Sequence, residues 1–192
     1  MRCPICNNYK FKKLTSLYDD RYGEPNTYTI KMCIKCKHLC TYPRLKYEDL
    51  SKLYGSFYPR SNIKISSLLE EVIKENRRFS RLLRWINGTN NQGQFYAKKN
   101  NLVLDIGCGD CVSLLQAKNI GAKVFGIEAD KNISNIANQL KLDIFFGDIK
   151  ENPFSDKKFD LIIMNQVIEH IPDPDKLLEI IKNRLAINGL VI

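Results

Sequence analysis

The sequence predicts an α/β fold in which a doubly wound, mostly parallel sheet follows a small cysteine-rich module. Three features of the 192 residues lead to this class. Apolar runs alternate with helical patterns from residue 101 onward, two glycines follow the first of these runs, and two C-x2-C pairs occur near the N-terminus. Strands that alternate with helices of this length form right-handed βαβ units and a parallel sheet.

We divide the chain into residues 1–60, a cysteine-rich module, residues 61–100, a helix and a linker, and residues 101–192, the α/β domain. Apolar residues recur at helical spacing over residues 62–87, and the Gly- and Asn-rich residues 87–94 are typical of a polar linker. In the last segment we expect strands at 101–107, 123–128, 143–148, 159–166 and 190–192, and helices at 111–120, 131–142 and 173–190, with stops at Gly121 and Gly189.

The stretch LVLDIGCGDC, residues 102–111, carries the first functional signal. Asp105 lies near the end of a buried strand, and Gly107 and Gly109 let the backbone turn tightly and admit a ligand at contact distance. Ligands of open parallel sheets bind outside the carboxyl ends of the strands. Glu128 ends the next strand about 20 residues later, where a carboxylate can accept both hydroxyls of a ribose. The pattern therefore predicts a nucleoside-containing ligand; the alternative is that Glu128 is a surface acid at a strand end.

Together with the stretches Gly147-Asp148 and FDLIIMNQVIEHIPDP (159–174), these residues resemble a class I S-adenosylmethionine-dependent methyltransferase. The resemblance implies a Rossmann-like sheet and S-adenosylmethionine as cofactor. It implies the following cofactor-binding residues: Asp105, Gly107, Cys108, Gly109, Glu128, Ala129, Asp148, Ile149, Asn165 and Gln166.

The resemblance also implies a role for each part of this set. Asp105 and the glycine turn would lie around the methionine part of the cofactor, and Glu128 would hold the ribose. Asp148 would approach the adenine amino group, with Ile149 beside the ring. Asn165 and Gln166 would face the methionine end and the transferred methyl group.

The sequence departs from the family pattern in two places. Cys111 stands where a third glycine is often found, so its side chain is expected to crowd the cofactor. The family's sheet usually has seven strands and ends in an antiparallel hairpin, whereas here the fifth strand is the last one predicted. We therefore expect a domain that is truncated at its C-terminus and lacks the hairpin strands, which leaves the activity of these 192 residues alone an open question.

Two C-x2-C pairs in the first segment have the spacing of a structural zinc ribbon. The x2 spacing lets both sulfurs of a pair reach one ion, and four thiolates close a tetrahedral site with no open position for catalysis. The predicted ligands are Cys3, Cys6, Cys33 and Cys36. His38 and Cys40 are interpreted as neighbours of the site rather than ligands. Chance occurrence or disulfide pairing is the alternative.

The layout as a whole is similar to methyltransferases found among sugar- and polysaccharide-modifying enzymes, in which a zinc module precedes the methyltransferase domain. This resemblance implies a nucleotide-linked sugar or a glycan as acceptor. His170 is the candidate general base because it follows the fourth strand of the domain and an imidazole suits proton removal. The alternative is that His170 packs against the following helix and caps it.

Charge and composition leave other functions open. Residues 1–100 hold 20 Lys and Arg against 8 Asp and Glu, a net charge of +12, whereas residues 101–192 hold 10 against 13, a net charge of −3. The basic half could contact the phosphates of a nucleotide-linked sugar through Arg77, Arg78, Arg81 or Arg84, or those of RNA, as in an RNA methyltransferase. A truncated, non-catalytic cofactor-binding protein is the third candidate. With no apolar run of membrane-spanning length and no signal core, we expect a cytoplasmic protein.

Overall fold

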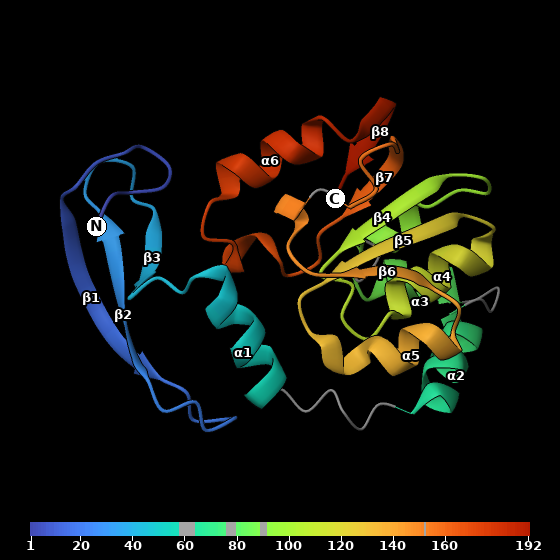
Figure 1. Cartoon of the computed structure of the whole chain (residues 1–192), viewed down its shortest axis with the longest axis horizontal. Coiled ribbons are helices and arrows are strands. Elements are labelled where there is room, and N and C mark those ends of the chain that lie inside the picture. Colours follow the sequence, from blue (N-terminus) through green and yellow to red (C-terminus); the bar gives the residue numbers. More distant parts are fainter. Residues whose placement is uncertain (58–63, 76–79, 89–91, 152) are drawn as a thin grey trace.

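The computed structural model describes residues 1–57, 64–75, 80–88, 92–151 and 153–192. It contains two sheets with a helix between them (Figure 1). The N-terminal sheet has three antiparallel strands, and α1 (Tyr47–Phe57) leads from this module to the second sheet, which has five strands.

The N-terminal module is built on strands β1 (Phe11–Tyr18), β2 (Thr27–Cys33) and β3 (Leu39–Tyr42) in sheet order β1-β2-β3. Asp19 holds the turn between β1 and β2 because its carboxylate accepts hydrogen bonds from three backbone N–H groups, those of Arg21 at 2.9 Å, Tyr22 at 3.1 Å and Glu24 at 3.0 Å. These bonds, led by the one from Glu24, lower the pKa of Asp19. A single carboxylate thus orders the turn that the sequence RYGEPN indicates.

The second sheet is entirely parallel, as predicted from the alternation of strands and helices. Its strand order is β6-β5-β4-β7-β8, with β4 at the centre. The strands are β4 (Leu102–Ile106), β5 (Lys123–Glu128), β6 (Asp143–Phe146), β7 (Phe159–Ile163) and β8 (Leu185–Val191). The predicted α/β class with a Rossmann-like sheet is therefore confirmed.

Helices cover both faces of this sheet (Figure 1): α2 (Ile65–Glu75), α4 (Val112–Ile120) and α5 (Ser134–Gln139) on one face and α6 (Pro174–Lys182) on the other. Alternating residues of β4 show how the two cores form. Val103 packs with Ala117 of α4, whereas Leu104 packs with Leu177 of α6. Within the described ranges, no helix is both long and apolar enough to cross a membrane.

The segment before the parallel sheet differs from the prediction. The single helix expected at 62–87 is described as α2 and α3 (Ser80–Ile86), with residues 76–79 outside the described part. The expected polar linker ends in a short 3-10 helix, η2 (Gly93–Tyr96). This helix packs closely on β7: a Cβ on Gly93 would lie only 2.7 Å from Cγ2 of Ile163. Residues 89–91 of that linker lie outside the description. The sequence patterns above do not predict α1.

The last predicted helix is also too long, because α6 ends at Lys182 and β8 begins at Leu185. The Arg184 side chain donates to the carbonyl oxygens of Phe154 and Ser155 and fixes the chain after the helix. Gly189 lies in a bulge of β8 rather than at a helix stop. A Cβ on Gly189 would lie 2.8 Å from the carbonyl oxygen of Phe159, so only glycine permits this approach of the two strands.

The docking of α6 can be tested with two neighbouring leucines. Leu177 is 1% exposed, whereas Leu178 is 44% exposed. We expect Leu177→Ala to lower the free energy of unfolding by about 2–5 kcal/mol, because it removes buried methyl groups and leaves a cavity. The matched variant Leu178→Ala should cost less than about 1 kcal/mol. Urea denaturation measures both values, and equal losses would contradict the packing described here.

Candidate functional site

The glycine turn starts at the end of the central strand β4. Gly107 and Gly109 have φ angles of 71° and 55°, in the left-handed region that glycine adopts without steric cost. The Gly107 N–H donates to the carbonyl oxygen of Ile127 at 2.7 Å, and a Cβ on Gly107 would lie 2.6 Å from Cγ2 of Val167. The turn is therefore held between the end of β5 and the segment that follows β7.

Asp105 lies under this turn with 2% of its surface exposed. Its Oδ2 accepts a hydrogen bond from the hydroxyl of Ser113 on α4. The pKa of the Asp105 carboxyl is raised to about 7, chiefly by burial. The hydrogen bond from Ser113 acts in the opposite direction, and the negative charge of Glu128 adds to the rise. Asp105 can therefore change its charge near neutral pH when a cation enters or leaves its surroundings.

Glu128, at the end of β5, is buried and fixed by backbone donors. The Gly109 N–H donates to Oε2 at 2.7 Å, and the Asp130 N–H donates to Oε1 at 2.9 Å. Bonds from backbone donors to a carboxylate are among the strong hydrogen bonds of proteins. Glu128 thus ties the glycine turn to β5, a structural role that the sequence did not reveal.

Asp148 and Ile149 follow β6 at the start of a short 3-10 helix, η4 (Ile149–Glu151). Oδ1 of Asp148 accepts from the Lys150 N–H at 2.9 Å, and the Asp148 N–H donates to Oε1 of Glu151 at 2.8 Å. Ile149 is 5% exposed and packs in the core on the α6 face. Both residues therefore lie at the predicted sheet edge, Asp148 at the surface and Ile149 inside.

A pocket of about 900 Å³, here called the polar pocket, opens beside the glycine turn. Six predicted cofactor residues line it: Asp105, Gly107, Cys108, Gly109, Asn165 and Gln166. Glu128, Ala129, Asp148 and Ile149 are not part of its lining. The structure thus gathers the residues predicted for the methionine end, and leaves those predicted for ribose and adenine beyond this pocket, at the ends of β5 and β6.

The polar pocket also contains residues that the sequence analysis did not name as site residues: Glu71, Gln92, Gln94 and Gln116. Gln116 is 6% exposed within a helix whose buried positions are otherwise largely apolar, and that contrast is a sequence signal for a site. Gln94 stands in a polar stretch and gives no such signal. Arg84, one of the four arginines named above as possible phosphate ligands, also lines this pocket.

Cys111 does not crowd the polar pocket, which corrects the expectation for the missing third glycine. Its φ is 70°, so the backbone keeps the left-handed conformation that favours glycine. Its side chain is fully buried in the core with α2, α4 and α5 and is absent from the pocket lining.

The four predicted zinc ligands form one cluster. The sulfur atoms of Cys3, Cys6, Cys33 and Cys36 all lie within 4.8 Å of one another, and no other group of the described residues offers three or more possible metal ligands. The Sγ atoms of Cys3 and Cys36 are 3.6 Å apart, and those of Cys6 and Cys33 are 3.5 Å apart. A tetrahedral zinc ion with Zn–S bonds of about 2.3 Å would hold its sulfur ligands about 3.8 Å apart. The distances in the cluster therefore fit a zinc ion coordinated by four thiolates.

The two cysteine pairs form equivalent turns. Asn7 and Lys37, which directly follow the second cysteine of each pair, have φ angles of 59° and 65°. The N–H of each donates to the carbonyl oxygen of the first cysteine of its pair, Cys3 or Cys33, at 3.0 Å. The N–H of Cys36 lowers the pKa of Cys33 to about 6, whereas burial and the neighbouring cysteines raise the pKa of Cys36. In the absence of a metal, the cluster therefore favours one thiolate at Cys33 over several.

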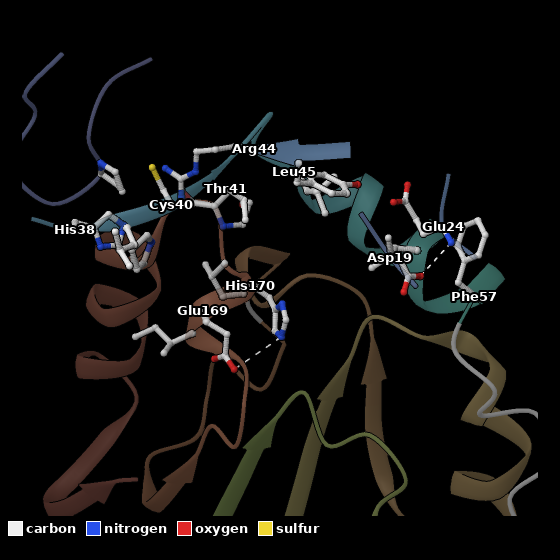
Figure 2. A pocket seen from close by; sticks show the side chains of 18 of the residues that line it. Asp19, Glu24, His38, Cys40, Thr41, Arg44, Leu45, Phe57, Glu169 and His170 are labelled. Atoms are coloured by element: carbon white, nitrogen blue, oxygen red, sulfur yellow. Dashed lines mark hydrogen bonds and ion pairs between the residues drawn. The ribbon is translucent and has the colours of Figure 1, made fainter. Parts of the chain in front are cut away.

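A second pocket of about 730 Å³, here called the module pocket, lies between the N-terminal module, α1 and the segment after β7 (Figure 2). His170 lines it, with Nε2 3.9 Å from Oε1 of Glu169 and its ring edge-on to Tyr54 at 6.1 Å between centroids. His38 and Cys40 of the module line it as well. The strands of the parallel sheet point toward this pocket with their carboxyl ends (Figure 2).

Arg44 connects the two walls of the module pocket. Its Nη2 donates to the carbonyl oxygen of Pro172 at 2.6 Å, and α1 makes a further contact through the bond from Asn132 Nδ2 to the carbonyl oxygen of Gly55 at 3.3 Å. The module is thereby attached to the α/β domain on the side of the predicted base.

A parallel doubly wound sheet with a glycine turn and an acid at the next strand end is typical of α/β domains that bind nucleosides. In a comparison with known families, residues 104–192 match the family described as a methyltransferase domain. The match covers 89 of the 192 residues.

Two curated relatives are named ubiquinone biosynthesis O-methyltransferase. The one from Glaesserella parasuis serovar 5 (strain SH0165) is 32% identical over 160 residues, 76% of this chain and 60% of the relative. The one from Pelagibacter ubique (strain HTCC1062) is 33% identical over 99 residues, 48% of this chain and 41% of the relative. The chain thus spans less than two thirds of the length of either relative.

Among solved structures, the [4+2]-cyclase SpnF has a similar fold, with a TM-score of 0.52 at 16% identity over 78% of this chain and 60% of that one. Because that protein is named as a cyclase, the likeness supports the fold and not a reaction.

The raised pKa of Asp105 predicts a pH effect on stability. The carboxyl keeps its proton in the folded protein up to about pH 7, whereas the unfolded chain loses it near its ordinary value of 3.8. The unfolded state therefore binds fewer protons in this window, and the unfolding free energy falls as pH rises through it.

Asp105→Asn should remove this fall while keeping an acceptor for Ser113. Between pH 5 and 8 we expect the wild type to lose roughly 1–3 kcal/mol of stability relative to the Asn variant. Urea denaturation of both proteins across this range measures the difference. Parallel pH curves would show that Asp105 does not titrate as described.

Proposed function

We propose that the chain is an S-adenosylmethionine-dependent methyltransferase that acts on a hydroxyl group of a small molecule bound in the module pocket. One observation carries this proposal: a single short segment after β7 lines both pockets. Asn165 and Gln166 line the polar pocket, and two residues after Gln166 begins the run of Ile168, Glu169 and His170, which lines the module pocket. A donor site and an acceptor site that share a wall are what group transfer between two bound molecules requires.

The residues present fit the cofactor. When bound, S-adenosylmethionine supplies an electrophilic methyl group. Asp105 and the glycine turn would hold its methionine part, Glu128 the ribose, and Asp148 with Ile149 the adenine. The buried carboxylate of Glu128 already accepts two N–H donors in a fixed orientation, which is the preorganised acceptor that ribose hydroxyls require.

His170 is the proposed base for the acceptor hydroxyl. Its side chain is 43% exposed and lines the module pocket, so a bound hydroxyl has access to the ring. The carboxylate of Glu169 at 3.9 Å would stabilise the imidazolium formed when the proton is taken up. No residue on the module side of this pocket other than His38 has an imidazole.

The chemistry of the module pocket bears on the acceptor class. Its described lining is largely aromatic and aliphatic, with Tyr22, Tyr28 and Phe57 among the aromatic residues. Its arginines are Arg21, whose guanidinium lies 5.0 Å from the ring of Tyr22, and Arg44, which is bonded to Pro172. This lining favours an aromatic hydroxyl compound over a nucleotide-linked sugar, whose diphosphate requires several cations. The names of the two curated relatives support an O-methyl acceptor.

The nucleotide-linked sugar or glycan predicted from the sequence is the competing acceptor, and RNA is a third. A panel assay with labelled S-adenosylmethionine separates them, using phenols and catechols, nucleotide-linked sugars and RNA. We expect methyl transfer to an aromatic hydroxyl. Transfer to a sugar or to RNA would replace this acceptor class, and cofactor binding without any transfer would favour a non-catalytic cofactor-binding protein.

The role of His170 is tested in the same assay. His170→Gln should lower kcat by about 10²–10⁴-fold, because proton removal in the transition state is lost, while the affinity for S-adenosylhomocysteine stays within about twofold. The matched variant His38→Gln changes the other imidazole of the module pocket and should leave most of kcat intact. Equal effects of both substitutions would assign His170 to acceptor binding alone.

The N-terminal cluster is proposed to bind a structural zinc ion through Cys3, Cys6, Cys33 and Cys36. The sulfur distances and the two equivalent turns support this assignment. Four thiolates leave no open position, so the ion would stabilise the module rather than take part in transfer. A metal site also accounts for a module whose sheet has few buried residues.

Elemental analysis should find about one zinc per chain in the purified protein. Cys33→Ser should abolish stoichiometric binding, because it removes a buried ligand. Cys40→Ser is the control, since Cys40 lies in the same module but outside the cluster, and it should keep the metal. A wild-type protein with a folded module and no metal would refute the assignment.

A further inference from the structure

Helix α3 turns its apolar side chains toward water. Four of them are more than half exposed: Leu82 (53%), Leu83 (55%), Trp85 (71%) and Ile86 (62%). Arg84 lies among them in the sequence, but it is partly buried and lines the polar pocket. A surface helix ordinarily buries its apolar stripe and exposes its charged residues. The orientation of α3 is the opposite, and its four exposed apolar side chains form a surface that is here called the α3 face.

The α3 face is continuous, because residues three or four positions apart are neighbours on a helix. Ile86 follows Leu82 by four positions and Leu83 by three, and Trp85 follows Leu82 by three. Single exposed apolar residues are common on proteins, but a contiguous patch of them marks a contact with another molecule or with a membrane. The chemistry around the patch can therefore identify what binds there.

The chain around the α3 face is strongly basic. Residues 60–99 contain nine Lys and Arg against three Asp and Glu, a net charge of +6. Among the described residues of this range, Lys64, Lys98 and Lys99 are exposed. A second copy of the chain that paired through the α3 face would bring two such segments together, and the like charges would oppose the contact. The charge therefore favours an anionic partner.

The aliphatic side chains of the α3 face favour a lipid surface over a nucleic acid. A base can stack on an aromatic ring such as that of Trp85, but Leu82, Leu83 and Ile86 offer no such platform. A bilayer accommodates all four side chains, because its acyl chains are apolar and indole rings favour the level of the headgroups. Trp and Leu on one side of a helix, with basic residues nearby, are typical of helices that lie in the plane of a bilayer surface.

We propose that the α3 face binds the surface of an anionic lipid bilayer, with its four apolar side chains among the headgroups and the basic charge of residues 60–99 attracted to the lipid phosphates. The contact is peripheral, since α3 has seven residues and none of the described helices has the length and hydropathy of a membrane span. Attraction of Lys and Arg to an anionic surface adds to the burial of apolar area. The inference uses neither pocket and is independent of the proposed function.

The chain has a single tryptophan, Trp85, which belongs to the α3 face and reports on it directly. The probes are vesicles of phosphatidylcholine alone and vesicles of phosphatidylcholine mixed with phosphatidylglycerol. With the anionic vesicles we expect the tryptophan emission to move to shorter wavelength, because the indole leaves water. Binding to the neutral vesicles should be at least about 10-fold weaker. Salt at about 1 M should weaken the binding to the anionic vesicles, because it screens the charges.

Leu83→Asn tests the apolar contact, and Leu178→Asn is the matched control. Leu178 is 44% exposed and lies on α6, on the other face of the parallel sheet. Leu83→Asn should weaken binding to the anionic vesicles about 10-fold, because it removes apolar area from the contact. Leu178→Asn should leave the affinity within about twofold. Urea denaturation shows whether both variants are folded.

Several results would overturn the proposal. An emission shift that grows with protein concentration in the absence of vesicles would assign the α3 face to a second copy of the chain. A shift with a single-stranded RNA oligonucleotide, and none with vesicles, would assign it to nucleic acid. Vesicle binding without an emission shift, or equal losses in the two variants, would place the lipid contact elsewhere on the protein. Absence of binding to either kind of vesicle would refute a lipid contact altogether.

Discussion

The structure depends on the central position of β4, which is hydrogen-bonded to β5 on one side and to β7 on the other. Parallel pairing on both sides brings the carboxyl ends of three strands to one edge. Glu128, the glycine turn and Asn165 are far apart in the sequence, yet each follows or ends one of these strands. The bond from the Gly109 N–H to Glu128 then fixes the turn against the neighbouring strand, so the shape of the polar pocket follows from the sheet.

The features predicted from the sequence are those that local patterns determine. The strands of the α/β domain are short apolar runs bounded by turn residues. Parallel pairing of these strands is enough to bring the acids and glycines at their carboxyl ends to one edge of the sheet. The cysteine cluster could be predicted as well, because the C-x2-C spacing of metal ligands occurs twice in the sequence. The structure brings all four sulfurs together from two turns that lie about 30 residues apart, as that repetition implies.

The features that were missed depend on contacts across the fold. Gln94 lies in the polar pocket on η2, which packs against β7, and Arg84 of α3 contacts Phe95 of the same η2; nothing in the linker sequence specifies these contacts. The end of α6 was misplaced because Leu185–Val191 continues a helical apolar pattern, while pairing with β7 makes it a strand. Cys111 shows the opposite case: its backbone follows the glycine pattern, and its side chain finds room in the core.

The wall shared by the two pockets has a thermodynamic consequence. Val167 packs on Gly107, so residues 165–170 cannot move on the module side without changing contacts at the glycine turn. If occupation of one pocket shifts this segment, the affinity of the other pocket changes by a coupling free energy that is the same in both directions. The order in which the two pockets are filled would then affect the rates but not the total free energy of the doubly occupied protein. The sign of the coupling would decide whether a ligand in the module pocket slows or speeds the release of a ligand from the polar pocket.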